Sequence, residues 1–173
     1  MQASRCLYFG KKGSPPTKNR TMKKRTLLFT ALLSCLWWGG KAQTPTTMVT
    51  QEKDSAAIAQ SLENIYFKGI YEGDVELLRQ LYHPGTLLFG DVQGKPYAKN
   101  LEQYLDGVKN RQSVRDSGKP FKGEIVDIRI INSIAVAELK VKMYDFNYEE
   151  FLSFHKIDGH WLIVNKMISH VDQ

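Results

Sequence analysis

Aromatic side chains are the residues of this sequence best suited to forming a binding site. Tyrosine is frequent among them, and it combines an apolar ring with a hydroxyl that can orient a ligand. Aromatic rings also build protein cores, so only part of the set can face a cavity. The residues predicted to line a pocket for a small apolar or aromatic ligand are Tyr66, Ile70, Phe89, Tyr97, Tyr104, Tyr144, Phe154 and Trp161.

Two histidines, His155 and His160, flank a hairpin turn predicted at Asp158-Gly159 and are the candidate metal ligands. If Ile157 pairs with His160, the histidines share a sheet face as diagonal neighbours, about 7–8 Å apart. A third ligand would have to come from Glu149 or His170, and nothing in the spacing brings one close. We therefore predict no metal and no cofactor, and a solvated sheet edge instead.

Both cysteines, Cys6 and Cys35, lie in the first 42 residues. The remainder of the chain contains none, which excludes disulfides, thiolate catalysis and cysteine metal sites there.

The formal net charge of +6 is unevenly distributed. Residues 1–42 hold nine of the 24 Lys and Arg residues and no Asp or Glu, which leaves residues 43–173 with a net charge of −3. This balance argues against a nucleic-acid partner. One basic loop could attract an anionic ligand, although a solvated loop is the default reading: Lys109, Arg111, Arg115, Lys119 and Lys122.

The first 42 residues have the pattern of an export signal. A basic segment from Met22 precedes an apolar stretch, Leu27 to Trp38, that is short for a membrane span, and small residues precede Gln43. We predict an over-extended start over 1–21, a cleaved signal peptide over 22–42, a periplasmic or secreted protein, and no membrane attachment after cleavage. A lipoprotein anchored at Cys35 is the disfavoured alternative, because the apolar segment continues beyond that cysteine.

Helical patterns fill the first half of the remaining chain. After a predicted linker over 43–53, a domain over 54–173 begins with a helix that Asp54 or Ser55 caps and Gly73 ends. Asp74 caps a second helix up to Tyr82. Asn100 caps a third helix, after a hairpin over 86–99 that turns at Gln93-Gly94.

Strands fill the second half, at roughly 121–131, 134–146, 148–157 and 160–170, after a polar loop over 111–120. Helices followed by an antiparallel meander predict an α+β fold, with the helices on one face of the sheet. The last strand is apolar at almost every position from Trp161 to Ile168. Such a strand needs cover on both faces, which predicts a homodimer formed through the sheet.

Two segments carry a family resemblance. The first is Tyr71-Glu-Gly-Asp74 with Leu77-Leu78 and Leu81-Tyr82-His83-Pro84, and the second is Phe154 to Lys166 around Asp158-Gly159. Over residues 54–171 the chain resembles the nuclear transport factor 2-like superfamily, and within it the SnoaL-like and putative lumazine-binding group of exported Bacteroidetes proteins. The resemblance implies a cone of curved antiparallel sheet around three helices, a ligand-admitting mouth and dimers through the sheet.

Ketosteroid isomerases share this implied fold and use a tyrosine, a carboxylate base and a protonated acid. The resemblance puts Tyr66 at the tyrosine position. Gly90 falls at the base position with Asp91 beside it, and the protonated acid falls near Leu152-Ser153, where no acid stands. Related cyclases and dehydratases use an acid–base histidine, for which His83 is the candidate.

We therefore expect a pocket protein without catalytic activity. The alternative is an acid–base enzyme of the isomerase, dehydratase or cyclase type, in which Tyr66 acts with Asp91 or His83. A carboxylate or imidazole within hydrogen-bond reach of Tyr66 would favour the enzyme.

Overall fold

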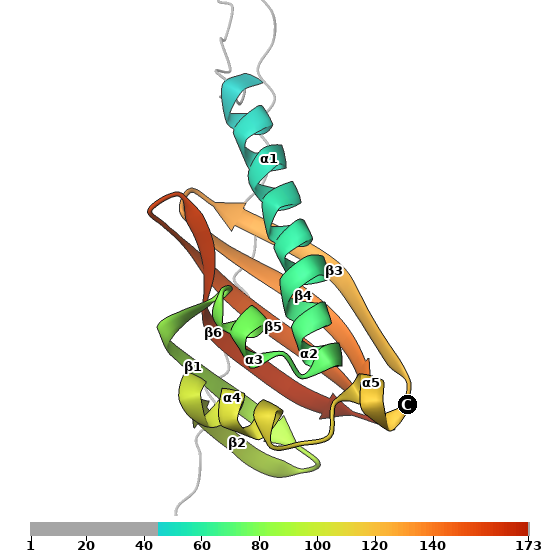
Figure 1. Cartoon of the computed structure of the whole chain (residues 1–173). Coiled ribbons are helices and arrows are strands. Elements are labelled where there is room, and N and C mark those ends of the chain that lie inside the picture. Colours follow the sequence, from blue (N-terminus) through green and yellow to red (C-terminus); the bar gives the residue numbers. More distant parts are fainter. Residues whose placement is uncertain (1–44, 173) are drawn as a thin grey trace, which may run out of the picture. The chain divides into compact units, whose positions relative to one another are not determined.

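The computed structural model describes residues 45–172, so the leader predicted over residues 1–42 lies outside the described residues. The described part has an α+β fold in which helices pack on one six-stranded sheet, as the sequence predicted (Figure 1). None of the helices in this part combines the length and the apolar character that crossing a bilayer requires.

The sheet has the strand order β2-β1-β6-β5-β4-β3. Its strands are β1 (Tyr82–Val92), β2 (Lys95–Asn100), β3 (Phe121–Ile131), β4 (Ile134–Met143), β5 (Phe146–Ile157) and β6 (His160–Val171). All neighbouring strands are antiparallel except β1 and β6, which run parallel. The hairpin turns at Asp158-Gly159 as predicted, and Ile157 pairs with His160. The turn before β5 lies at residues 144–145, earlier in the chain than the break at residue 147 between the strands predicted over 134–146 and 148–157.

The first helix is longer than the sequence predicted. It runs without a break through α1 (Pro45–Ser61), the π-helical segment η1 (Leu62–Phe67) and α2 (Lys68–Glu72), so most of the predicted linker is helical. Asp54 consequently lies inside the helix and caps nothing. Its carboxylate accepts hydrogen bonds from Lys156 Nζ at 2.6 Å and Trp161 Nε1 at 3.2 Å, which tie the helix to the sheet.

The ends of the helices follow the predicted caps. Gly73 ends α2 with φ +71°, a conformation that glycine adopts without steric cost. Asp74 caps α3 (Val75–Arg79), which is shorter than predicted because β1 already begins at Tyr82. Asn100 and Gln103 form a reciprocal capping box on α4 (Leu101–Lys109). A short helix, α5 (Val114–Ser117), interrupts the predicted loop.

The core lies between the helices and the inner face of the sheet. Ile58, Leu62 and Ile70 of the long helix are buried there against sheet residues such as Leu139 and Leu152. In Figure 1 the long helix lies across the sheet on the side of β3 and β4, and α4 lies over the hairpin of β1 and β2. The opposite, outer face of the sheet exposes large apolar side chains, among them Phe89, Phe151 and Met167.

Candidate functional site

Three polar side chains meet inside the core. Tyr66 Oη donates a hydrogen bond to Glu150 Oε2 at 2.5 Å. Lys166 Nζ donates to Glu150 Oε1 at 2.6 Å and to Tyr66 Oη at 2.5 Å. Their residues are 0%, 2% and 3% exposed, in the order Tyr66, Glu150, Lys166. A fully buried ion pair that shares a tyrosine hydroxyl is costly to desolvate, and such groups concentrate at functional sites.

Strand alternation brings Glu150 to this position. Tyr148, Glu150, Leu152 and Phe154 are all buried on the inner face of β5, two residues apart. The predicted site of a protonated acid, Leu152-Ser153, was therefore one pleat too far along the strand. The carboxylate sits at Glu150 instead, directly against Tyr66.

A β-bulge brings Lys166 to the same place. On β6, Ile163 pairs with Phe154 and Asn165 with Ser153, so Val164 has no partner across the ladder. The extra residue reverses the alternation: Trp161 and Ile163 face inward before the bulge, and Lys166 faces inward after it. Strict alternation from Trp161 would have placed Lys166 on the outer face.

The cluster holds Tyr66 as a neutral donor. Burial and the nearby Glu150 carboxylate raise the pKa of the Tyr66 hydroxyl well above its ordinary value. The Lys166 ammonium also lies 5.2 Å from the ring centroid of Tyr66 and 5.4 Å from that of Tyr104, so two aromatic faces add to its stabilisation. The arrangement brings a carboxylate, an ammonium group and a phenol hydroxyl together at one buried point.

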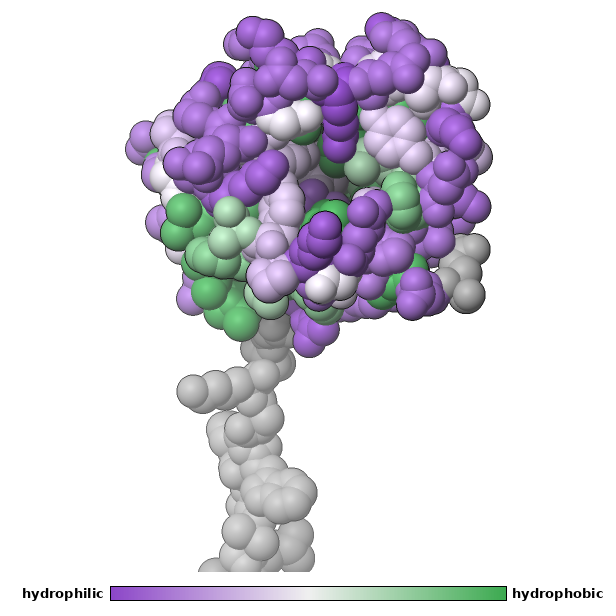
Figure 2. Space-filling view, turned by 90° about the horizontal axis from the view of Figure 1, so that it is seen from below, coloured by the Kyte–Doolittle hydropathy of each residue, from purple (hydrophilic) through white to green (hydrophobic). Residues whose placement is uncertain are grey.

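A cavity of about 110 Å³ adjoins the cluster. Its apolar wall consists of Ile70, Val92, Val141, Met143 and Ile168. Its polar lining consists of Tyr97, Tyr104, Arg111, Tyr148, Glu150 and Lys166. Figure 2 views the molecule from the end that carries α4 and the β1–β2 hairpin, and this face is hollowed near its centre within a largely hydrophilic surround.

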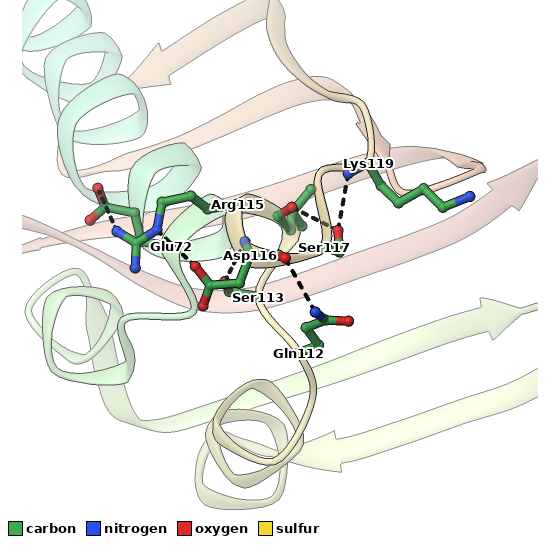
Figure 3. Close-up of polar contacts among 8 residues, drawn as sticks. Glu72, Gln112, Ser113, Arg115, Asp116, Ser117 and Lys119 are labelled. Carbon is green, nitrogen blue, oxygen red and sulfur yellow. Dashed lines mark hydrogen bonds and ion pairs between the residues drawn. The ribbon is translucent and has the colours of Figure 1, made fainter.

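Arg111 reaches the cavity from the segment between α4 and α5. Its guanidinium lies 6.0 Å from the ring centroid of Tyr144, and its Nε is buried without a hydrogen-bond partner. The following residues are held by their own contacts (Figure 3): Ser113 Oγ caps α5 by accepting from Asp116 N at 3.0 Å, and Arg115 lies between Asp116 and Glu72. Tyr144 Oη also donates to the carbonyl of Gln112.

The predicted pocket residues divide between cavity, core and surface. Ile70, Tyr97 and Tyr104 line the cavity, and Tyr66 lies behind Glu150 and Lys166 without reaching its surface. Tyr144 is half-buried beside Arg111, and Phe154 and Trp161 belong to the core.

The prediction that Phe89 lines the pocket is wrong. It is 47% exposed and pairs with Met167, which places both on the outer face, while the neighbouring pair Leu88 and Lys166 faces inward. Sequence alone did not fix the parity of β1, because Leu87, Leu88 and Phe89 are all apolar.

The two predicted acid–base partners of Tyr66 also lie elsewhere. Asp91 pairs with Ser169 and accepts a hydrogen bond from its hydroxyl at 3.0 Å. His83 accepts a hydrogen bond from the backbone N–H of Gly85 through Nδ1 at 3.0 Å. Neither residue lines the cavity. Gly90 stands where ketosteroid isomerases would have the carboxylate base. A Cβ added to Gly90 would lie 1.7 Å from the carbonyl oxygen of Ile168, so an acidic residue could not replace this glycine.

His155 and His160 do not converge with a third ligand. His155 pairs with Leu162 across the ladder, and His170 packs its ring against Phe146 and Tyr148. Within residues 45–172, no group of three His, Cys, Asp or Glu side chains is arranged to hold a metal ion.

The fold is shared with solved bacterial structures. A nuclear transport factor 2-like protein of Silicibacter pomeroyi superposes with a TM-score of 0.63 at 16% identity, covering 70% of this chain and 98% of that one. One from Shewanella baltica gives 0.62 at 22% identity, covering 70% and 97%. Likenesses at these identities show the fold.

The sequence also has a named relative. It is 24% identical over 121 residues to "Aldolase FrzH" of Cladobotryum sp., which covers 69% of this chain and 92% of that protein. The model of the family described as "Putative lumazine-binding" matches residues 53–169, nearly the whole described part of the chain. The protein therefore belongs to the putative lumazine-binding family.

Proposed function

We propose that the protein binds a small, partly apolar organic molecule in the cavity beside Glu150 and Lys166 and releases it unchanged. The cavity itself is the observation that carries the proposal. An apolar wall with a few converging polar groups is the usual composition of a small-molecule site. The family description and the shared fold agree with a pocket protein.

The size of the cavity limits what can enter. About 110 Å³ is somewhat smaller than the engineered lysozyme cavity of roughly 150 Å³ that holds benzene. One ring, or a chain of similar bulk, is therefore the part of a ligand that the cavity would enclose. Tyr97, Tyr104 and Tyr148 offer it aromatic faces and hydroxyl groups.

The internal closure of the polar cluster favours binding over turnover. Each of the three side chains is hydrogen-bonded to the other two, so the cluster is satisfied without a ligand. Its members would act as a fixed polar end to the cavity.

An acid–base enzyme is the second candidate, and Glu150 is the observation that favours it. Both Glu150 and Lys166 line the cavity. The carboxylate could remove a proton next to a substrate carbonyl, with the ammonium donating to the resulting enolate oxygen. The enolate carbon could then be reprotonated by the Glu150 carboxyl, or attack a second carbonyl whose alkoxide takes up that proton. The second course is aldol chemistry, in line with the name of the Cladobotryum relative.

Native mass spectrometry of the protein purified from its own host would test the proposal. A single stoichiometric small molecule, identified after denaturation, is the result expected for a binding protein. Incubation of that molecule with the protein in deuterated water then separates the two functions. A binding protein returns it unlabelled, whereas an enzyme that enolises it introduces deuterium, and Glu150→Gln should abolish that exchange.

The exposed apolar side chains of the outer sheet face support a homodimer. Phe89, Met167 and Phe151 stand side by side on β1, β6 and β5 and are 42–53% exposed. An exposed apolar row that crosses several strands is typical of a protein interface. We propose that a second copy covers it. Sedimentation should give twice the monomer mass, and Phe151→Lys should restore the monomer.

We also propose export through the signal sequence over residues 22–42, with a periplasmic or secreted mature protein. N-terminal sequencing of protein from the native host should begin at Gln43. Lipid attached at Cys35 would instead establish an anchored lipoprotein.

A further inference from the structure

Resting on the pocket function proposed above, we propose that the cavity selects an anionic ligand. The ligand would be a single-ring carboxylate, or a longer molecule that ends in one. Its ring would lie against the apolar wall and its carboxylate would accept hydrogen bonds from Arg111.

The charges that line the cavity are unequal. Arg111 and Lys166 are cationic, and Glu150 is the one acidic residue of the lining. Lys166 already pairs with Glu150 at 2.6 Å. In residues 45–172 no carboxylate lies within ion-pairing distance of Arg111. The cavity therefore keeps one uncompensated cation, which an anionic ligand would neutralise.

The hydrogen bonds of Arg111 are also incomplete. Its Nε is buried and donates to no acceptor in the described part of the chain. Leaving a buried donor unpaired costs free energy, and the cost is larger for a charged group. A ligand carboxylate would accept from Nε and from a neighbouring guanidinium nitrogen together, in the two-pronged geometry that arginine favours. An uncharged ligand could accept a hydrogen bond from Arg111 but would not neutralise its charge.

The segment that carries Arg111 is fixed before any ligand arrives. Tyr144 holds it on one side through its ring and through the bond from its hydroxyl to Gln112. On the other side, Figure 3 shows Gln112 donating to the carbonyl of Asp116 and Arg115 bridging to Glu72 of α2. A cation held in place loses little side-chain entropy on binding, which favours its use in recognition.

Arg111 also acts on its tyrosine neighbours in the cavity. Burial raises the pKa of Tyr97 to about 12, and the Arg111 cation opposes that rise. The same opposition acts on Tyr148. Both hydroxyls therefore remain neutral donors near the guanidinium, ready to assist it in binding an anion.

Benzoate and benzamide are matched probes, because they share one ring and differ in charge. We would titrate the full chain with each and follow amide and Arg111 Nε–H resonances by NMR. Wild type, Arg111→Gln and Lys68→Gln would be compared. Lys68 is an exposed residue on the long helix, so its variant makes the same change in net charge away from the cavity.

Benzoate should bind wild type at least about tenfold more tightly than benzamide, shifting the Arg111 Nε–H resonance. Arg111→Gln should lower the affinity for benzoate by about the same factor and change the affinity for benzamide by less than about twofold. Lys68→Gln should change neither affinity. Equal affinities for both probes, unaffected by Arg111→Gln, would overturn the anion preference and leave the pocket function standing. Cavity resonances that respond to neither probe would overturn both.

Discussion

The hydroxyl of Tyr66 lies 2.5 Å from a carboxylate oxygen of Glu150, a residue 84 positions further along the chain. This bond joins the π-helical segment of the long helix to the inner face of β5, at the end of the cavity. Because Lys166 donates to both groups, the three side chains act as one unit that connects the helix, β5 and β6. The stability of the fold and the chemistry of the cavity thus depend on the same atoms.

Tyr66→Phe should lower the free energy of unfolding by about 1–3 kcal/mol. The variant keeps the ring but leaves the buried Glu150 and Lys166 each with one hydrogen bond fewer. Urea denaturation measures the change. Tyr71→Phe is the matched control, because Tyr71 lies on the same helix, is 36% exposed, and should change stability by less than about 0.5 kcal/mol. Equal effects of the two variants would contradict a role for the buried hydroxyl.

Removing one partner of the buried ion pair should cost more than removing both. Lys166→Met alone leaves the Glu150 carboxylate buried without its cation, which is expected to cost about 3–5 kcal/mol. The double variant Lys166→Met, Glu150→Leu replaces the pair with apolar groups and should be clearly more stable than Lys166→Met.

An exposed pair on the same sheet provides the control for this prediction. Lys140 and Glu149 lie opposite each other on β4 and β5, 3.9 Å apart and about half exposed. Breaking that pair should cost at most about 1 kcal/mol, because solvent screens it. Additive losses from the two single substitutions at Lys166 and Glu150 would show that the buried pair is not coupled.

Much of the fold could be predicted because the residues that start and end its helices and turns act locally. The caps at Asp74 and Asn100, the stop at Gly73 and the turn at Asp158-Gly159 each act over a few residues, and the structure confirms all four. Local signals failed at the first helix. Asp54 has a good capping side chain, but Lys156 and Trp161, distant in sequence, use it instead.

The candidate site was predictable only in part, because it depends on which face each strand turns inward. Glu150 could have been found, since Tyr148, Leu152 and Phe154 mark its face as apolar and a lone acid among them stands out. Lys166 could not have been found, because the bulge at Val164 reverses the alternation of β6 and no residue type in the sequence indicates a bulge there. Asp91 became a candidate because it lies beside Gly90, which the resemblance to ketosteroid isomerases put at the base position, and Glu150 was not considered.

Gly90→Ala should be among the most damaging single substitutions in the sheet. Its φ is +148°, and an added Cβ would lie 1.7 Å from the carbonyl oxygen of Ile168, so β1 and β6 would have to separate. A loss of about 3 kcal/mol or more is expected. Gly94→Ala makes a matched comparison at φ +70° with open space around it, and should cost only about 1 kcal/mol. Similar losses at the two positions would show that backbone conformation, rather than contact with β6, sets the cost.

Alkaline pH should destabilise the protein through its buried tyrosines. Burial is the largest cause that raises the pKa of Tyr66, Tyr82 and Tyr148, and it brings that of Tyr97 to about 12. An unfolded tyrosine loses its proton near pH 10. Above that pH the unfolded chain binds fewer protons than the folded one, so the free energy of unfolding falls as pH rises. Below about pH 9 the phenols are protonated in both states and contribute no slope.

Urea denaturation at a series of pH values from 8 to about 12 would measure this slope. Tyr97→Phe removes a hydroxyl that keeps its proton in the folded state and loses it in the unfolded state. The free energy of unfolding should therefore fall less steeply above pH 10. Tyr71→Phe, at a position 36% exposed, should leave the decline as steep as in wild type. A stability that stays level through this range, or a Tyr97→Phe profile parallel to that of wild type, would mean that the cavity tyrosines exchange protons with solvent in the folded state. In that case burial would not raise the pKa of these tyrosines, and only the ordinary weak acidity of a phenol would keep their hydroxyls neutral near pH 7.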